Sequence, residues 1–205
     1  MTRRTFRRIG LALLGAAVAC ADPGAPGGAA LTDGTPSMGG TSAPVVVAMT
    51  DTAPQLETYA AAFWAVQGQR TTFRLHYLAP EQDSAGDGEL QKHLVVTIPA
   101  FTQIVRPDGT CLSEGDSLSI SVTVDGSDLA VELGPDGTAF TGDPLHLSLW
   151  LDYADLRPGL DAQSLRIWYR PPDSDDWEPQ PTRVIAAGKA LLADLRHFSN
   201  YAVAY

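Results

Sequence analysis

Residues 116–125 place the tightest limit on the fold, because apolar and polar side chains alternate along them one by one. Serine and threonine separate four apolar positions, which are Leu118, Ile120, Val122 and Val124. A period of two residues is typical of a β-strand with one buried face, whereas a helix needs a period of about 3.6 residues. This segment therefore predicts an antiparallel sheet that packs one face on a hydrophobic core.

Similar alternation, or a short apolar run, recurs through residues 44–205. We predict strands at 45–49, 57–66, 71–78, 93–99, 116–125, 128–133, 145–152, 165–170, 177–187, 189–195 and the terminal segment. The turn at residues 67–69 joins the second and third of these as one hairpin, and only residues 153–164 leave room for a short helix. Short strands with turn signals about every ten residues indicate an all-β fold, an antiparallel β-sandwich.

The chain closes on an apolar and aromatic segment, residues 195–205, that has no polar tail. Untied termini fray, so a segment of this composition is expected to be held in the core. We predict that it forms the closing strand of the sandwich, with Phe198, Tyr201 and Val203 buried.

Residues 1–19 have the composition of an export signal. Four arginines lie within the first ten residues, and the apolar run at 11–19 is too short to span a membrane as a helix. Residues 2–6, Thr-Arg-Arg-Thr-Phe, resemble the twin-arginine signal. Arg7 and Arg8 depart from that pattern, which leaves the general secretory route open.

The segment Ala17-Val18-Ala19-Cys20 resembles a bacterial lipobox, whose cysteine becomes the first residue of the mature chain and carries lipid. Two or more acyl chains anchor a protein stably where one is marginal. The alternative is a soluble secreted protein whose signal ends in cysteine. With Cys20 lipidated, Cys111 would stand alone in a turn, without a disulfide or a zinc-binding pair.

Residues 20–43 comprise the cysteine expected to carry lipid, Cys20, and a linker rich in Gly, Pro, Ala, Ser and Thr. Such a segment cannot bury enough apolar surface to offset the entropy lost on ordering, so it predicts a flexible tether. One folded domain, residues 44–205, is expected beyond it.

The formal net charge of −10 excludes a nucleic-acid-binding role, which requires a basic surface. No glycine-rich phosphate loop or nucleophile elbow occurs, and the four histidines lack metal-ligand spacing. Two groups of aspartates, at 152, 155 and 161 and at 173, 175 and 176, lack the spacing of a calcium loop. We expect neither a cofactor nor a metal.

The order of several short motifs in residues 91–205 resembles a ZU-five-type domain, a β-sandwich module of zonula occludens, netrin-receptor, ankyrin and death-domain adaptor proteins. These motifs are Val96-Thr97-Ile98-Pro99-Ala100, Gly134–Phe140, Pro144–Leu147, Trp168-Tyr169, Trp177-Glu178-Pro179 and His197–Tyr201. Phe101-Thr102 departs from the glycine usual after that alanine. Phe63–Val66 also resembles a strand that precedes this module in bacterial lipoproteins, which implies that residues 44–90 belong to the same globule.

The resemblance implies a self-cleavage site at His197-Phe198-Ser199, because some death-domain relatives cleave at this triplet. Ser199 would attack the carbonyl of Phe198 with His197 as base, forming an ester that is then hydrolysed. The alternative is that His197 and Ser199 make ordinary hydrogen bonds while Phe198 packs. Serine needs activation and a strained peptide bond, which three residues do not supply by themselves.

Trp150 and Trp168 lie out of phase with the leucine and isoleucine rows of their strands. If those rows face the core, both indoles face outward and provide a surface for a carbohydrate or protein partner. The alternative is that residues 44–90 cover them.

The sequence thus predicts an exported lipoprotein, anchored to the membrane by its N-terminal lipid, in the cell envelope and facing the periplasm or the cell exterior. Its β-sandwich is expected to be a binding or structural module, not an enzyme.

Overall fold

The computed structural model describes residues 43–78, 91–172 and 174–205, which belong to one compact unit. Within these ranges the fold is all-β, with two one-turn 3-10 helices at Ala162–Ser164 and Ala186–Gly188 and no α-helix. The predicted fold class is therefore confirmed. The predicted export signal, Cys20 and nearly all of the tether lie outside the described residues.

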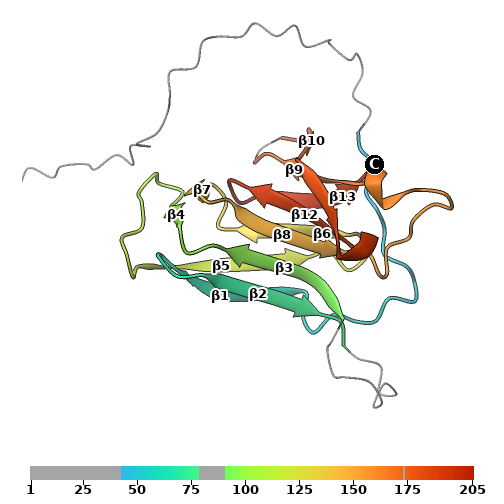
Figure 1. The fold of residues 1–205 in the computed structure, drawn as a ribbon, viewed down its shortest axis with the longest axis horizontal. Helices are drawn as coiled ribbons and strands as arrows, with labels where there is room; N and C mark the ends of the chain where they lie inside the picture. Colours follow the sequence, from blue (N-terminus) through green and yellow to red (C-terminus); the bar gives the residue numbers. More distant parts are fainter. Residues whose placement is uncertain (1–42, 79–90, 173) are drawn as a thin grey trace, which may run out of the picture. The chain divides into compact units, whose positions relative to one another are not determined.

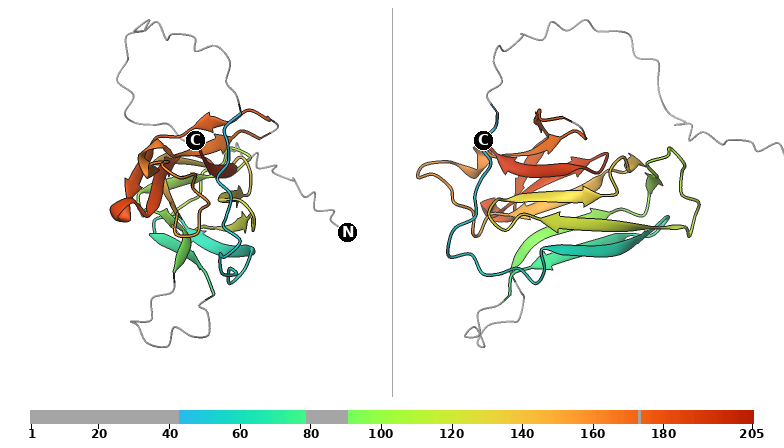
Figure 2. Two further views of the ribbon diagram at one scale, coloured as in Figure 1. Left: turned by 90° about the vertical axis from the view of Figure 1, so that its right-hand side faces the viewer. Right: turned by 180° about the vertical axis from the view of Figure 1, so that it is seen from behind.

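Two antiparallel sheets pack together as a sandwich (Figures 1 and 2). In spatial order, the six-stranded sheet comprises β1 (Ala60–Val66), β5 (Ser117–Val124), β6 (Ala130–Gly134), β13 (Asn200–Ala204), β9 (Arg166–Arg170) and β10 (Glu178–Pro179). The five-stranded sheet comprises β11 (Thr182–Ile185), β12 (Ala190–Leu195), β8 (Leu145–Trp150), β3 (Lys92–Ile98) and β2 (Thr71–His76). A separate ribbon pairs β4 (Thr102–Val105) with β7 (Ala139–Gly142).

The core lies between the inner faces of the two sheets, where the alternating apolar rows meet. Ile120 of β5 and Leu147 of β8 are both fully buried, and the serines between the apolar positions of β5 are exposed. Burial of a Leu or Ile side chain contributes about 1.5–3 kcal/mol, which fixes which face of each strand points inward.

The terminal strand β13 runs between β6 and β9, so it is central in its sheet. Phe198 and Tyr201 are 1% exposed and Val203 is fully buried, which confirms the predicted burial of all three side chains.

The predicted hairpin of β1 and β2 is wrong, because the two strands belong to different sheets. β1 pairs with β5, and β2 pairs with β3. The connection through Gly68 (φ +85°) crosses from one sheet to the other, and the rings of Phe63 and Phe73 stack 5.0 Å apart at this margin. Each strand thereby buries its apolar face on the shared core instead of on its sequence neighbour.

Residues 45–49 do not form a continuous strand. Val46 forms a bridge with Ala204 and Ala48 forms one with Asp128, so the segment lies between the ends of β13 and β6. Val47 is 1% exposed there. This segment therefore fills the space where the two strands diverge.

Candidate functional site

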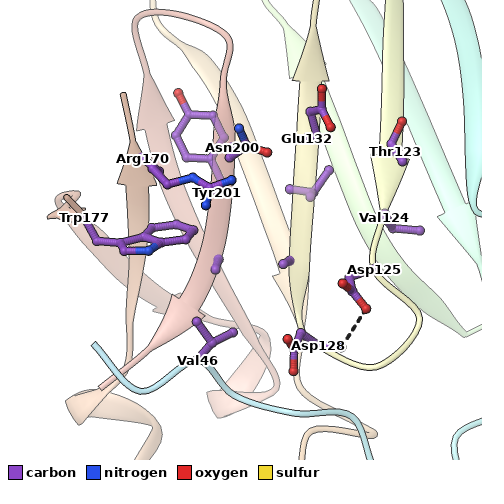
Figure 3. A pocket seen from close by; sticks show the side chains of 13 residues that line it. Val46, Thr123, Val124, Asp125, Asp128, Glu132, Arg170, Trp177, Asn200 and Tyr201 are labelled. Carbon is purple, nitrogen blue, oxygen red and sulfur yellow. Dashed lines mark hydrogen bonds between the residues drawn. The ribbon is translucent and has the colours of Figure 1, made fainter. Parts of the chain in front are cut away.

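A cleft of about 350 Å³ opens on the outer face of the six-stranded sheet, the face turned away from the core (Figure 3). Side chains of β5, β6, β13 and β9 line it, together with Val46 and with Trp177, which lies just before β10. It combines an aromatic side chain with several hydrogen-bonding groups, as ligand sites do.

Strand register places four polar side chains in one row across this face. Thr123 pairs with Glu132, Glu132 with Asn200, and Asn200 with Arg170. Paired residues in an antiparallel sheet project to the same side, so the row presents a hydroxyl, a carboxylate, an amide and a guanidinium together. With neighbouring strands about 4.8 Å apart, the row is about 14 Å long.

The floor beside this row consists of small side chains. Ala130 of β6 pairs with Ala202 of β13, and both line the cleft. Alanine at these two positions leaves the sheet surface hollow, since any larger residue there would fill the space above the strands.

One wall of the cleft is aromatic. The Arg170 guanidinium lies over the Trp177 ring, 5.3 Å from its centroid, which holds the indole beside the polar row. Figure 3 shows Trp177 and Arg170 on one side of the cleft and Asp125 and Asp128 on the other. The cleft therefore has an aromatic end and an acidic end.

The acidic end is held in place by the turn between β5 and β6. Ser127 donates two hydrogen bonds to Oδ1 of Asp125, from its hydroxyl (2.6 Å) and its backbone N–H (2.8 Å). Both bonds lower the pKa of Asp125, and the bond from the hydroxyl has the larger effect. Burial, followed by the nearby Asp125 charge, raises the pKa of Asp128. With Glu132, the acids outnumber the single arginine of the cleft, so its field favours neutral or cationic ligands.

A second cavity, of about 500 Å³, lies between residues 48–56 and the same turn. His93 borders it and is 1% exposed; its Nδ1 hydrogen-bonds the Tyr77 hydroxyl at 2.9 Å, and its Nε2 has no hydrogen-bond partner. Burial lowers the pKa of His93 to about 4, so the ring is neutral at pH 7. Asp125 and Asp128 border this cavity as well.

Trp150 and Trp168 do not form one surface, because they lie on different sheets. Trp168 pairs with Ala202 on the outer face of the six-stranded sheet and donates its Nε1–H to the Ala204 carbonyl (3.3 Å). Trp150 is on β8 of the five-stranded sheet, with the Lys92 ammonium 5.8 Å from its ring centroid. The sequence predicts Trp177 as the first residue of a strand, 177–187, with no sign that it lines a cleft. In the structure that stretch is divided between β10 and β11, and Trp177 lies just before β10.

The His197-Phe198-Ser199 triplet lies at the start of β13. Ser199 is fully buried, and its hydroxyl donates to the Arg170 carbonyl at 2.6 Å. His197 Nδ1 is 3.2 Å from the Tyr201 hydroxyl, and its ring lies 4.2 Å from that of Tyr169 between centroids. The Ser199 hydroxyl is thus directed to a backbone carbonyl and not to His197. Self-cleavage stays a prediction.

Cys111 is disulfide-bonded, so it does not stand alone as expected for a chain in which Cys20 carries lipid. The sequence contains one other cysteine, Cys20, which lies outside the described residues. A sulfur atom that carries lipid cannot also form a disulfide, so lipidation of Cys20 and a Cys20–Cys111 disulfide exclude each other.

The remaining candidates give no further site. His146 Nδ1 lies 2.7 Å from Asp194, which also pairs with Arg183 at 3.1 Å, on the outer face of the five-stranded sheet. Across residues 43–78, 91–172 and 174–205, no three His, Cys, Asp or Glu side chains gather as potential metal ligands. Within the same ranges no helix is long and apolar enough to cross a membrane.

No protein-family model, no curated protein and no solved structure matches this chain. The likeness to ZU-five-type domains therefore remains an expectation, and the structure supports the fold class alone, an all-β sandwich.

Proposed function

We propose that this protein is a glycan-binding module of an exported surface protein, and that it binds without turnover. The observation that carries the proposal is the row formed by Thr123, Glu132, Asn200 and Arg170 beside the Trp177 indole. Export rests on the signal-like residues 1–19. Anchoring through Cys20 would require that its sulfur is not part of the disulfide of Cys111.

The cleft matches the chemistry of a sugar ring. The face of a pyranose that carries only C–H groups packs on an indole, which is large, rigid and amphipathic. Its hydroxyls need planar groups that donate and accept hydrogen bonds in pairs, as amide, carboxylate and guanidinium groups do. Asn200, Glu132 and Arg170 supply one of each.

The acidic side chains of the cleft limit the class of glycan that it can bind. Asp125, Asp128 and Glu132 would repel uronic acids, sulfated sugars and phosphodiesters. A neutral glycan, or one with ammonium groups that reach the acidic end, fits better.

The test is calorimetric titration of the full chain with two soluble probes, a β-1,4-linked glucose hexamer and a β-1,4-linked glucosamine hexamer. We expect both to bind, and the glucosamine hexamer to bind more tightly and with a stronger dependence on salt. Trp177→Ala should weaken binding about tenfold, since loss of one aromatic contact costs about 1–1.5 kcal/mol.

Trp150→Ala is the matched control, because it removes an indole from the other sheet and should leave affinity unchanged. Absence of binding by both probes, or equal affinity of the wild-type and Trp177→Ala chains, would overturn the proposal.

A further inference from the structure

The edge strand β1 has unused hydrogen-bonding groups at its centre. Odd-numbered residues pair their backbone with β5, as the bonds Tyr59 O to Val124 N and Gln67 N to Asp116 O show at the two ends. Even-numbered residues therefore direct N–H and C=O to the free edge. Thr58 satisfies both groups of Ala60, through bonds of 2.6 and 3.2 Å.

At the other end of this edge, the Val66 carbonyl accepts a hydrogen bond from Gln69 N (3.1 Å). Among the hydrogen bonds of the described part of the chain, none satisfies the edge-facing groups of Ala62 and Trp64. The open part of the edge thus comprises both backbone groups of Ala62 and of Trp64, with Phe63 between them, and the N–H of Val66.

The other three edges of the sandwich are protected in ways that β1 is not. β2 carries the exposed Arg74, β11 carries the exposed Arg183, and β10 is two residues long and contains Pro179. Charge, proline and shortness are the usual means of blocking strand addition. Among the described edge strands, β1 is the longest, with seven residues, and it has no charged side chain. Trp64 on its outer face is 65% exposed.

We infer that the β1 edge pairs with the β1 edge of a second copy of this chain, antiparallel and centred on Phe63. In this register Ala62 of each copy faces Trp64 of the other, so the N–H and C=O groups of these two residues bond one another. Each exposed indole then packs on the small side chain of an alanine. The contact is isologous, as a two-fold dimer requires.

The distribution of charge supports a second copy of this chain as the partner of the β1 edge. The chain is acidic overall, so most contacts between identical surfaces would bring carboxylates together. Residues 58–67 carry no charge. The paired strands themselves therefore bring no carboxylates together.

Sedimentation velocity of the full chain, at concentrations up to about 1 mM, tests the inference, because a strand pair is a small interface and is expected to be weak. The average mass should rise toward twice the monomer mass with concentration. Ala62→Lys and Ala62→Glu, each alone, should remain monomeric, since each places like charges across the two-fold axis.

An equimolar mixture of these two variants should recover the dimer, which shows that both are folded. Ala187→Lys adds the same charge at an exposed position beside β11, on the far edge of the other sheet, and should behave as wild type. A wild-type chain that is monomeric throughout, or a mixture that does not recover the dimer, would refute the β1 contact.

Discussion

His93 is a buried base that the fold keeps neutral, and its protonation links stability to pH. Its pKa falls to about 4 on folding because burial disfavours the charged ring, against about 6.5 in the unfolded chain. The unfolded state therefore binds more protons between these values, and stability falls as the pH is lowered from 6.5 toward 4.

We expect His93→Gln to reduce that loss. The difference in unfolding free energy between pH 7 and pH 4 should shrink by about 3 kcal/mol relative to wild type, measured by urea unfolding at both values. The introduced amide can still hydrogen-bond the Tyr77 hydroxyl, so the change isolates the titration. An unchanged pH dependence would show that His93 is not the group responsible.

The sulfur of Cys20 either carries lipid or forms a disulfide with Cys111. Intact mass measured under denaturing, non-reducing conditions distinguishes these two states. Lipidation predicts a chain that begins at residue 20 with added acyl mass and a reactive Cys111 thiol. A disulfide to Cys111 predicts no lipid and a gain of two hydrogens on reduction. We expect the disulfide, because Cys111 is disulfide-bonded in the structure. The lipidated mass would contradict this and would establish a membrane anchor.

The same spectrum tests the bond between Phe198 and Ser199. We expect a single full-length mass, because the Ser199 hydroxyl donates to the Arg170 carbonyl and has no contact with His197 that would activate it. A second species lacking residues 199–205 would establish self-cleavage.

At the scale of elements, β13 holds the six-stranded sheet together because it forms ladders with both β6 and β9. A chain that ends at Ser199 should lose cooperative unfolding, since two ladders open and the buried Tyr201 and Val203 are removed. A chain that lacks only Tyr205 should remain folded. Circular dichroism during urea titration distinguishes the two outcomes, and a normal transition in the shorter chain would contradict the central role of β13.

Strand positions could largely be predicted from the sequence, whereas strand partners could not. Alternation along β5 or β8 reports which residues are buried, and the structure places them so. It does not report which sheet a strand joins, because the inner faces of both sheets have the same apolar pattern. The short turn between β1 and β2 therefore predicts a hairpin, although each strand pairs with one that is more distant in sequence.

The short strands β4 and β7 are not predicted from the sequence, for a related reason. Thr102 and Gly142 pair across a long sequence separation, and neither segment has an alternating stretch long enough to be recognised. Likewise the polar row of the cleft depends on the register of four strands, which no local pattern encodes. Asn200 and Glu132 each look like ordinary surface residues in the sequence.

At the scale of the whole molecule, the cleft and the β1 edge lie on the same sheet but on different strands. Trp177→Ala should therefore leave the average mass in sedimentation unchanged. Ala62→Lys should leave the affinity for a soluble hexamer unchanged, because a single cleft suffices for that probe. Coupled effects of either change would show that the two surfaces are not independent.

The outward direction of the cleft has a consequence for the paired form. A two-fold axis perpendicular to a sheet keeps the outer faces of both copies on the same side, so a sheet continued through β1 would turn two clefts toward one target. An insoluble polymer with repeated sugars could then be held at both clefts, and the second contact would be intramolecular. Retention on such a polymer would exceed the affinity of either cleft by avidity alone, and Ala62→Lys would abolish that excess.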